Sequence, residues 1–152
     1  MFNKMKVKKK KKVIVVMPAY NAADTLEKTY KEIPLKFVDE VIIVDDCSKD
    51  NTVEIARRLG IKTIVHKKNK GYGGNQKTCY KNALKDGADI IIMLHPDYQY
   101  DPKAIPQILK LFYEDKADVA YGSRTYSIKS ALKGGMPIWK IFGNWVLSTL
   151  TN

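Results

Sequence analysis

The stretch "IIIMLHPDYQYDP", residues 90–102, joins two opposite kinds of sequence. Its first five residues form an uninterrupted apolar run, which is typical of a strand buried on both faces of a parallel sheet. His95 ends this run, and two prolines, two acids and an amide follow before a helical pattern begins at Pro102 or Lys103. The stretch therefore predicts a buried strand, then a polar loop, then a helix that crosses back over the sheet.

The same alternation recurs along the chain. Short apolar runs predict strands at residues 13–17, 41–44, 61–65, 90–94 and 119–122, and amphipathic patterns predict helices at about 24–33, 51–59, 74–85 and 103–113. Strands and helices that alternate in this way form a mostly parallel sheet covered by helices on both faces. The predicted fold class is therefore a Rossmann-like three-layer α/β/α sandwich. Ligands of such sheets bind beyond the carboxyl ends of the strands.

Local signals predict where these elements begin and end. Pro18 is expected to close the first strand, and Asp24 is expected to be the N-cap of the first helix, with Glu27 at capping-box spacing. Asn51 is expected to cap the second helix, and Gly60 to follow its last residue.

The net charge of +11 comes from 27 Lys and Arg residues against 16 Asp and Glu residues. Much of the excess lies in residues 1–12, a basic N-terminal tail. Such a tail is interpreted as a solvated arm, with attraction to phosphate-rich partners or to an anionic lipid surface as the alternative. We expect no nucleic-acid partner.

The apolar run after the tail, residues 13–17, is too short for a secretory signal, so we expect a cytoplasmic protein. Peripheral contact with the inner face of the membrane is the alternative location. Cys47 and Cys79 show no metal-binding spacing and are expected to be reduced, structural residues. The histidines, His66 and His95, are too few for a histidine-based zinc site.

Polar or small residues follow every predicted strand. The acid pair Asp45 and Asp46 at the end of the second strand fits either a turn cap or an acceptor for a nucleobase or ribose. The glycines at 71, 73 and 74, placed just before the predicted third helix, fit either an ordinary loop or a close backbone approach to an anion.

Two further loops carry groups that suit a diphosphate. Asp97 and Gln99 offer a carboxylate and a carbonyl oxygen two residues apart, which suits a hard cation completed by substrate phosphates. Arg124 has a guanidinium group that can donate two parallel hydrogen bonds to a phosphate. Together, the residues at the strand ends predict a crevice that binds a base, a ribose, a metal ion and a diphosphate.

Five ordered motifs carry a resemblance to a known family: "VIVVMPAYNAADTL", "VDEVIIVDDCSKDNT", "NKGYGGNQKT", "GADIIIMLHPDYQYDP" and "YGSRTY". Residues 12–126 resemble the inverting family-2 glycosyltransferases with the GT-A fold, in the branch of the dolichyl- or polyprenyl-phosphate sugar (mannose) synthases. The resemblance implies that a nucleotide-diphospho-sugar is held by Pro18, Ala19, Tyr20, Asn21, Asp45, Asp46, Gly71, Gly73, His95 and Pro96. It also implies that Asp97 and Gln99 face Mg²⁺ or Mn²⁺, and that Asp97 and Arg124 are the catalytic residues.

Two positions depart from the family pattern. His95 stands where the family has the first acid of its D-x-D motif, so the implied metal site has one carboxylate fewer. Ala22 stands where many members have a glutamate, which removes one polar contact from the donor pocket.

The predicted domains are the tail at 1–12, the nucleotide-sugar-binding domain at 13–126, and a linker with an amphipathic C-terminal helix at 127–152. The apolar residues of that helix span too few positions to cross a bilayer. The helix is expected to close the core, to lie on a membrane, or to pack on a partner, including a second copy of the chain.

The function predicted from the resemblance is transfer of a sugar, with inversion, from a GDP- or UDP-linked donor to an acceptor. A polyprenyl or dolichyl phosphate is the favoured acceptor, because it is largely ionised near neutral pH and needs no general base. The alternative is a donor-binding domain that lacks the acceptor half and is completed by another chain. A phospho-receiver domain is a third possibility, which the order of elements disfavours because its acid pair follows the first strand.

Overall fold

The computed structural model describes residues 11–122 and Trp139. Of the described residues, those from Lys11 to Lys116 form one compact unit, and Ala117 begins a second. The strands are β1 (Val13–Ala19), β2 (Glu40–Asp45), β3 (Lys62–Val65) and β4 (Ile90–Met93). The helices are α1 (Ala23–Lys31), α2 (Thr52–Arg58), α3 (Gly71–Lys85) and α4 (Ile105–Tyr113), with short 3₁₀ turns η1 (Leu35–Phe37) and η2 (Pro102–Ala104).

The four strands form one parallel sheet in the order β3-β2-β1-β4. The chain passes outward from β1 through β2 to β3, and α3 then carries it across to β4 on the other side of β1. The strand order along the chain therefore reverses between β1 and β4. Such a switch point opens a crevice at the carboxyl edge of the sheet, between the loops that follow the two strands.

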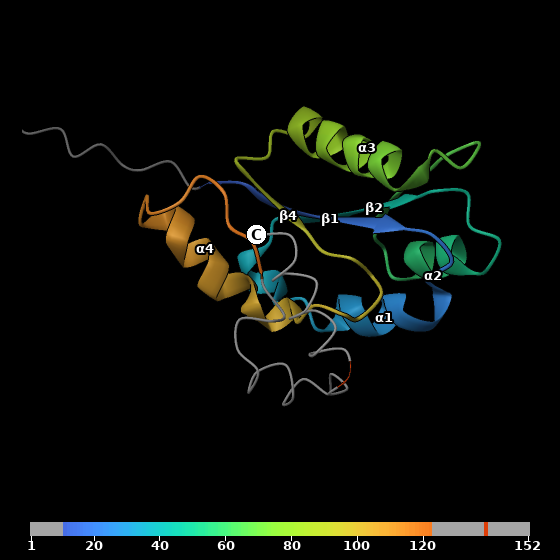
Figure 1. The fold of residues 1–152 in the computed structure, drawn as a ribbon, viewed down its shortest axis with the longest axis horizontal. Helices are drawn as coiled ribbons and strands as arrows, with labels where there is room; N and C mark the ends of the chain where they lie inside the picture. Colours follow the sequence, from blue (N-terminus) through green and yellow to red (C-terminus); the bar gives the residue numbers. More distant parts are fainter. Residues whose placement is uncertain (1–10, 123–138, 140–152) are drawn as a thin grey trace, which may run out of the picture. The chain divides into compact units, whose positions relative to one another are not determined.

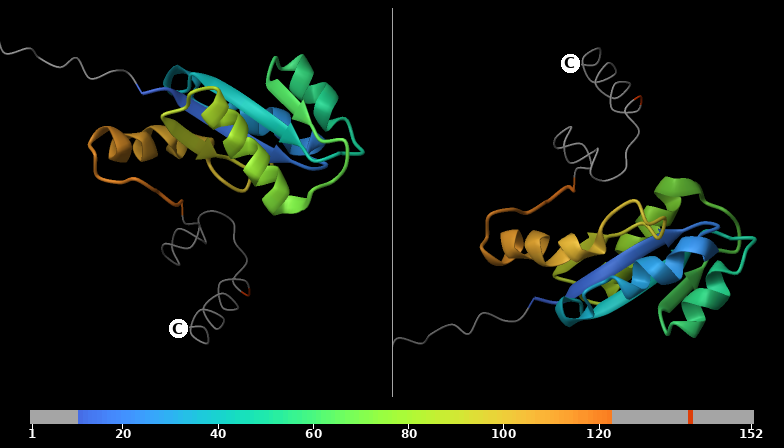
Figure 2. Two further views of the ribbon diagram at one scale, coloured as in Figure 1. Left: turned by 90° about the horizontal axis from the view of Figure 1, so that it is seen from above. Right: turned by 90° about the horizontal axis from the view of Figure 1, so that it is seen from below.

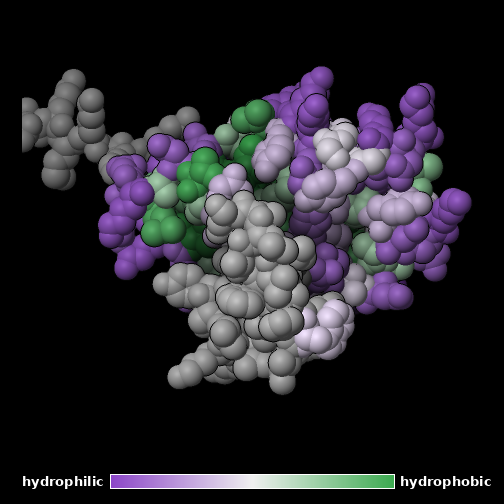
Figure 3. Space-filling view, viewed as in Figure 1, coloured by the Kyte–Doolittle hydropathy of each residue, from purple (hydrophilic) through white to green (hydrophobic). Residues whose placement is uncertain are grey.

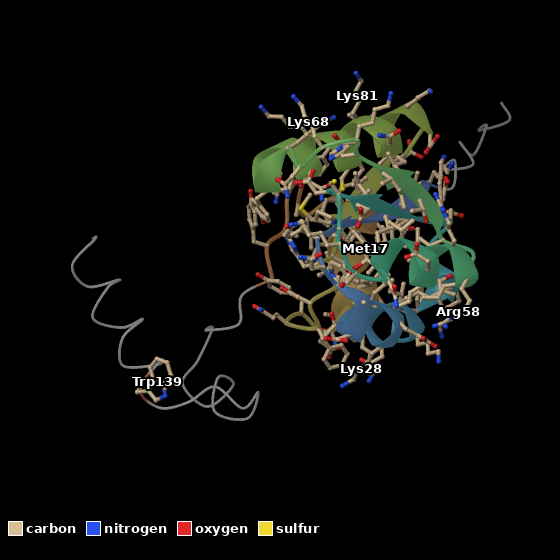
Figure 4. All side chains as sticks on the ribbon, turned by 90° about the vertical axis from the view of Figure 1, so that its right-hand side faces the viewer. Met17, Lys28, Arg58, Lys68, Lys81 and Trp139 are labelled. Carbon is tan, nitrogen blue, oxygen red and sulfur yellow. The ribbon has the colours of Figure 1, made fainter. Side chains whose placement is uncertain are left out.

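Helices cover both faces of the sheet. Figure 1 shows α3 on one face and α1 and α2 on the other, and the views from above and below in Figure 2 agree. One core layer holds Val13, Val15 and Met17 with residues of α1, α2 and α4, and the other holds Ile14 and Val16 with residues of α3. Met17, labelled in Figure 4, lies in the interior. The uninterrupted apolar run of β1 thus serves both layers, and the predicted α/β/α sandwich is confirmed.

Pro18 does not close β1, which continues to Ala19. The carbonyl of Val16 accepts a hydrogen bond from Leu94 on the β4 side, so Pro18, two residues later, also directs its backbone toward that side. Pairing with β4 has already ended at Val16, so no neighbouring strand needs the N–H that proline lacks.

The predicted cap of α1 is wrong, and the predicted cap of α2 is right in position only. α1 begins at Ala23 rather than after Asp24, and its N-cap, Ala22, makes no side-chain cap. The N–H groups of Ala22 and Ala23 instead donate to Thr52 Oγ1 and Asp50 Oδ2, at 2.8 and 3.0 Å. Asn51 occupies the N-cap position of α2, but its side chain makes no cap hydrogen bond. The N–H groups at the start of α1 are therefore satisfied by side chains from the loop before α2 and from the first residue of α2.

The fifth strand predicted at 119–122 is absent from the described residues, which are irregular there. Val119 is 64% exposed and Tyr121 is 93% exposed. An apolar run becomes a strand only when a neighbouring strand accepts its backbone hydrogen bonds, and the sequence pattern does not report such pairing.

Truncation of Leu26 to alanine is expected to lower the free energy of unfolding by about 2–5 kcal/mol, because the side chain is fully buried between α1 and the sheet. Urea unfolding followed by circular dichroism measures the loss. Leu84→Ala, at a leucine of α3 that is 63% exposed, is the matched control and is expected to stay within about 0.5 kcal/mol of the unmodified protein. Equal losses at the two positions would contradict the packing of the core.

The two cysteines are free thiols in different surroundings. Burial raises the pKa of Cys79 to about 12, whereas Cys47 is only partly buried. Since the thiolate is the reactive form, a thiol reagent at neutral pH is expected to modify Cys47 in the folded protein and to reach Cys79 only after unfolding. Mass spectrometry of the modified protein gives the count, and two modifications in the native state would contradict the burial of Cys79.

Candidate functional site

A cavity of about 350 Å³ lies at the carboxyl edge of the sheet, at the switch point between β1 and β4. Its walls come from the loops after β1, β2, β3 and β4 and from the beginning of α3. The lining residues are Pro18, Ala19, Tyr20, Asn21, Ala22, Thr25, Asp46, Asn69, Gly71, Tyr72, Asn75, His95, Pro96 and Asp97. This volume is in the range of pockets that hold small ligands.

Asp46 follows β2 and is held by a buried network. His66 Nδ1 lies 2.6 Å from Asp46 Oδ1, and the backbone N–H of Lys70 donates to the same oxygen at 2.8 Å. Thr78 Oγ1 lies 2.9 Å from the other ring nitrogen of His66. The Asp46 and His66 side chains are both 4% exposed. Because an ionised carboxylate can only accept, His66 donates from Nδ1.

This network sets the ionisation of Asp46. Burial by itself raises the pKa of the carboxyl, but hydrogen bonds from His66 and from the N–H groups of Lys70 and Gly71 outweigh it, so the pKa lies below its ordinary value. A lowered folded-state pKa means that Asp46 stabilises the fold above about pH 4. That contribution is lost as the pH falls through the folded-state pKa. Asp46 is thus a fixed, ionised acceptor at neutral pH.

Asp45, one residue earlier, has a different role. Its carboxylate accepts hydrogen bonds from the backbone N–H and the hydroxyl of Ser48, and it does not line the cavity. The Ser48 hydroxyl in turn accepts from the N–H of Asn21, whose side chain accepts from the N–H of Lys49. Asn21 has a positive φ of 49°, which asparagine tolerates better than most residues. Asp45 therefore builds the turn that fixes the loops after β1 and β2 against each other.

Two residues at the beginning of α3 complete this side of the cavity. α3 begins at Gly71, three residues earlier than predicted, so Gly71 and Gly73 lie in its first turn rather than in the preceding loop. Gly71 has a φ of +72°, which favours glycine, and its N–H donates to the Asn69 side chain. Asn75 is buried and donates to the carbonyls of Ala19 and Val44, at 3.2 and 3.0 Å, which joins the ends of β1 and β2. The positive end of the α3 dipole thus faces the cavity.

His95 forms the opposite wall with an aromatic partner. The rings of His95 and Tyr72 are stacked, with centroids 5.5 Å apart and planes inclined by 13°. The Tyr72 hydroxyl lies 3.2 Å from His95 Nε2. Tyr72 comes from α3 and His95 from the end of β4, so this pair spans the crevice.

Asp97 follows β4 and is exposed, and its Oδ1 accepts from the N–H of Gln99 at 3.0 Å. Within residues 11–122 and at Trp139, no three His, Cys, Asp or Glu side chains form a cluster that could hold a metal ion. Hard cations such as Mg²⁺ are commonly held by one or two carboxylates together with substrate phosphates. Asp97 therefore fits a cation shared with a bound diphosphate, and not one enclosed by protein ligands.

The cavity brings most of the predicted donor residues together with Asp97. Gly73, Gln99 and Asp45 are not among its lining residues, and Arg124 lies outside the described residues. Sequence reasoning missed Asn75, Thr25 and the pairing of His66 with Asp46. His66 directly follows β3, so the rule that places ligands at the carboxyl ends of strands was a signal for it.

Residues 14–146 match Glycosyl transferase family 2, and the chain belongs to this family. A dolichyl-phosphate N-acetylglucosaminyltransferase of Methanococcus voltae, which takes its sugar from UDP-N-acetylglucosamine, is 31% identical over 93% of this chain and 62% of its own length. The dolichol-phosphate mannosyltransferase of Pyrococcus furiosus is 32% identical over 74% of this chain and 33% of its own length. An uncharacterized protein of Methanocaldococcus jannaschii is 35% identical over 93% of this chain and 58% of its own length.

Among solved structures, the glucosyl-3-phosphoglycerate synthase of Mycobacterium tuberculosis, crystallised with Mn²⁺, UDP and glucosyl-3-phosphoglycerate, aligns with a TM-score of 0.57 at 24% identity. The alignment covers 67% of this chain and 39% of the synthase. The fold is therefore GT-A, as predicted. The chain spans less than two thirds of the length of each of these relatives.

Proposed function

We propose that this chain transfers a sugar, with inversion, from a nucleotide-diphospho-sugar to a polyprenyl or dolichyl phosphate. The observation that carries the proposal is the cavity at the switch point, where the ionised Asp46 and the exposed Asp97 come from different strand ends in a chain of family 2. Two relatives are named for transfer to dolichyl or dolichol phosphate, which supports this class of acceptor.

Each wall of the cavity is assigned one part of the donor. Asp46 accepts hydrogen bonds from the base or ribose, beside Pro18 and Tyr20. The first turn of α3 attracts the diphosphate through its N–H groups and its dipole. Asp97 would hold Mg²⁺ or Mn²⁺ on the phosphates, and when bound this cation supplies neutralisation of the charge on the leaving diphosphate. Gln99 remains a predicted ligand of this cation, and Arg124 remains a predicted contact of the donor phosphates.

The chemical step forms one bond and breaks another. An oxygen of the acceptor phosphate attacks the anomeric carbon on the face opposite the donor diphosphate, the bond from that carbon to the diphosphate oxygen breaks, and the nucleoside diphosphate leaves. The described acids that line the cavity are Asp46 and Asp97, and both are assigned to the donor. A phosphate acceptor fits this arrangement because it carries its own negative charge and needs no base.

Donor binding and transfer are tested separately. Isothermal titration with UDP- and GDP-linked sugars, with and without Mn²⁺, measures binding, and formation of a radiolabelled lipid from polyprenyl phosphate measures transfer. We expect micromolar donor binding and transfer by the same protein, and absence of donor binding would contradict the proposal. Binding without transfer would favour the second candidate, a donor-binding domain completed by another chain, which the partial coverage of the relatives supports.

His66 is expected to keep Asp46 ionised. In His66→Phe the hydrogen bond that lowers the pKa of Asp46 is lost while the burial that raises it remains, so the carboxyl is protonated at a higher pH. Donor affinity is expected to fall about tenfold because Asp46 loses a hydrogen-bond partner that holds it in place, and to weaken further as the pH is lowered. Calorimetry from pH 5 to 8 measures this.

The control for His66 is Thr78→Val, which removes the partner of the other ring nitrogen and leaves the hydrogen bond to Asp46 in place. This variant is expected to keep the pH dependence of the unmodified protein. If His66→Phe also kept that dependence, His66 would have no part in setting the ionisation of Asp46.

A further inference from the structure

The outward side of α3 presents apolar and cationic side chains in one patch. Lys77, Tyr80, Lys81 and Leu84 are spaced i, i+3, i+4 and i+7, so they lie together on one side of the helix, with Lys85 beside them. We call these five residues the α3 face. Tyr80 is 43% exposed and Leu84 is 63% exposed, and the three lysines are also exposed. Figure 4 shows Lys68 and Lys81 extending outward on the α3 side, opposite Lys28 and Arg58.

The charge along residues 66–85 is of one sign. Residues 66–85 contain Lys67, Lys68, Lys70, Lys77, Lys81 and Lys85 and no Asp or Glu. None of these lysines forms a salt bridge with another described residue, whereas on the opposite side of the sheet Lys31 and Arg58 pair with Glu27, and Lys110 pairs with Glu114. Hydrophilic side chains cover much of the described surface seen in Figure 3. Tyr80 and Leu84 are exposed hydrophobic residues between the lysines of α3. The α3 face is thus cationic and partly apolar, and its lysines form no salt bridge within the part of the chain that the structure describes.

We propose that the α3 face rests on an anionic membrane surface. Lysines near such a surface are attracted to its lipid headgroups, tyrosine favours the interface, and an exposed leucine gains by burial at the boundary of the acyl chains. The functional role of this membrane contact rests on the proposed function, because a polyprenyl phosphate acceptor is itself embedded in a membrane.

The helix α3 connects the proposed membrane contact to the cavity. Its first residues, Gly71 and Tyr72, line the cavity, and the α3 face begins six residues further along the same helix. A helix of 15 residues is about 22 Å long. A membrane along the α3 face therefore passes within about that distance of the cavity mouth, where the 65% exposed Tyr72 stands, and this is the longest distance that a lipid phosphate has to cover.

A nucleic acid is the rival partner for a cationic surface. The α3 face and the loop before it carry lysine only and no arginine, whereas arginine is the side chain that recognises phosphates and base edges bidentately. An exposed leucine also adds nothing to contact with phosphates. The combination of residues therefore favours a lipid surface.

Co-sedimentation of the full chain with vesicles tests the proposal. The vesicles contain phosphatidylcholine alone or mixed with phosphatidylglycerol, and neither donor nor acceptor is present. We expect binding to the mixed vesicles that weakens with added salt. The triple variant K77Q/K81Q/K85Q is expected to bind the mixed vesicles about 100-fold more weakly, because the loss of each lysine weakens binding about fivefold. Leu84→Ser is expected to bind about fivefold more weakly at an unchanged net charge.

The matched control is K36Q/K103Q/K110Q, which removes the same charge from exposed lysines on the other side of the sheet and is expected to change vesicle binding less than about threefold. Equal losses in the two triple variants, or no loss in Leu84→Ser, would overturn the proposal. Tighter binding to a single-stranded RNA oligonucleotide than to the mixed vesicles would also overturn it.

The vesicle-binding result is independent of the test of the proposed function, because donor binding is measured in a separate assay without vesicles. An α3-face variant that binds the donor normally but not the vesicles supports the membrane contact. If the unmodified chain binds vesicles as described but no nucleotide-sugar, the proposed function fails while the surface assignment stands.

Discussion

Replacement of Asp97 with alanine is expected to lower metal-dependent sugar transfer at least about 1,000-fold. Asp97 is the exposed carboxylate at the β4 end of the cavity, and His95 stands at the position where the family resemblance places a second acid. The loss of the only acid assigned to the cation removes charge neutralisation at the leaving diphosphate, an effect of several kcal/mol. Titration of Mn²⁺ into the donor-bound protein and the lipid-transfer assay measure it.

Asp101→Ala is the matched control for this variant. Asp101 lies four residues further on in the same loop, and its Oδ1 accepts from the N–H two residues ahead, as the Oδ1 of Asp97 does. Asp101 caps η2 and does not line the cavity, so its loss is expected to cost about 1 kcal/mol of stability and to leave metal-dependent donor binding in place. If both variants behaved alike, Asp97 would be only a turn residue.

Replacement of Asp46 with asparagine is expected to weaken donor binding by more than about 100-fold. The substitution preserves the shape of the side chain, but it replaces one acceptor oxygen by a donor and removes the charge that His66 and Lys70 N–H hold in place. Loss of one partner from a buried charged pair costs about 2–5 kcal/mol. Calorimetry with UDP and GDP, performed well below the melting temperature of the variant, measures the affinity.

Glu54→Gln supplies the control for Asp46. It removes one negative charge from the exposed surface of α2 and is expected to change neither nucleotide affinity nor melting temperature appreciably. Unchanged affinity in Asp46→Asn, with the fold confirmed by near-UV circular dichroism, would remove Asp46 from the donor site.

The apolar pattern was sufficient to predict the architecture and the edge of the sheet that carries the cavity. A run such as Val13 to Met17 has no polar face, so it can only be buried on both sides, and this places helices above and below it. Parallel strands end at one edge, which brings Tyr20, Asp46 and Asp97 to the same crevice although they are far apart in the chain.

The sequence signals for the ends of helices and strands were less informative, because the groups that satisfy these ends come from other parts of the chain. Asp24 and Asn51 had the residue type and spacing of caps, yet the N–H groups at the start of α1 are satisfied by Asp50, in the loop before α2, and by Thr52, the first residue of α2. The predicted strand at 119–122 failed for a related reason, since a strand requires a neighbour that a short apolar run does not identify.

By itself, then, the sequence determined a parallel α/β/α fold of family 2 and the strand ends that form its site, because burial on two faces leaves a direct pattern in the residues. Only the tertiary structure decided between the neighbours Asp45 and Asp46, since successive side chains of a strand point to opposite faces and the register selects which one meets the cavity. It also decided that His66, 20 residues away, is the partner of Asp46, because the pairing of β2 with β3 brings their carboxyl ends together.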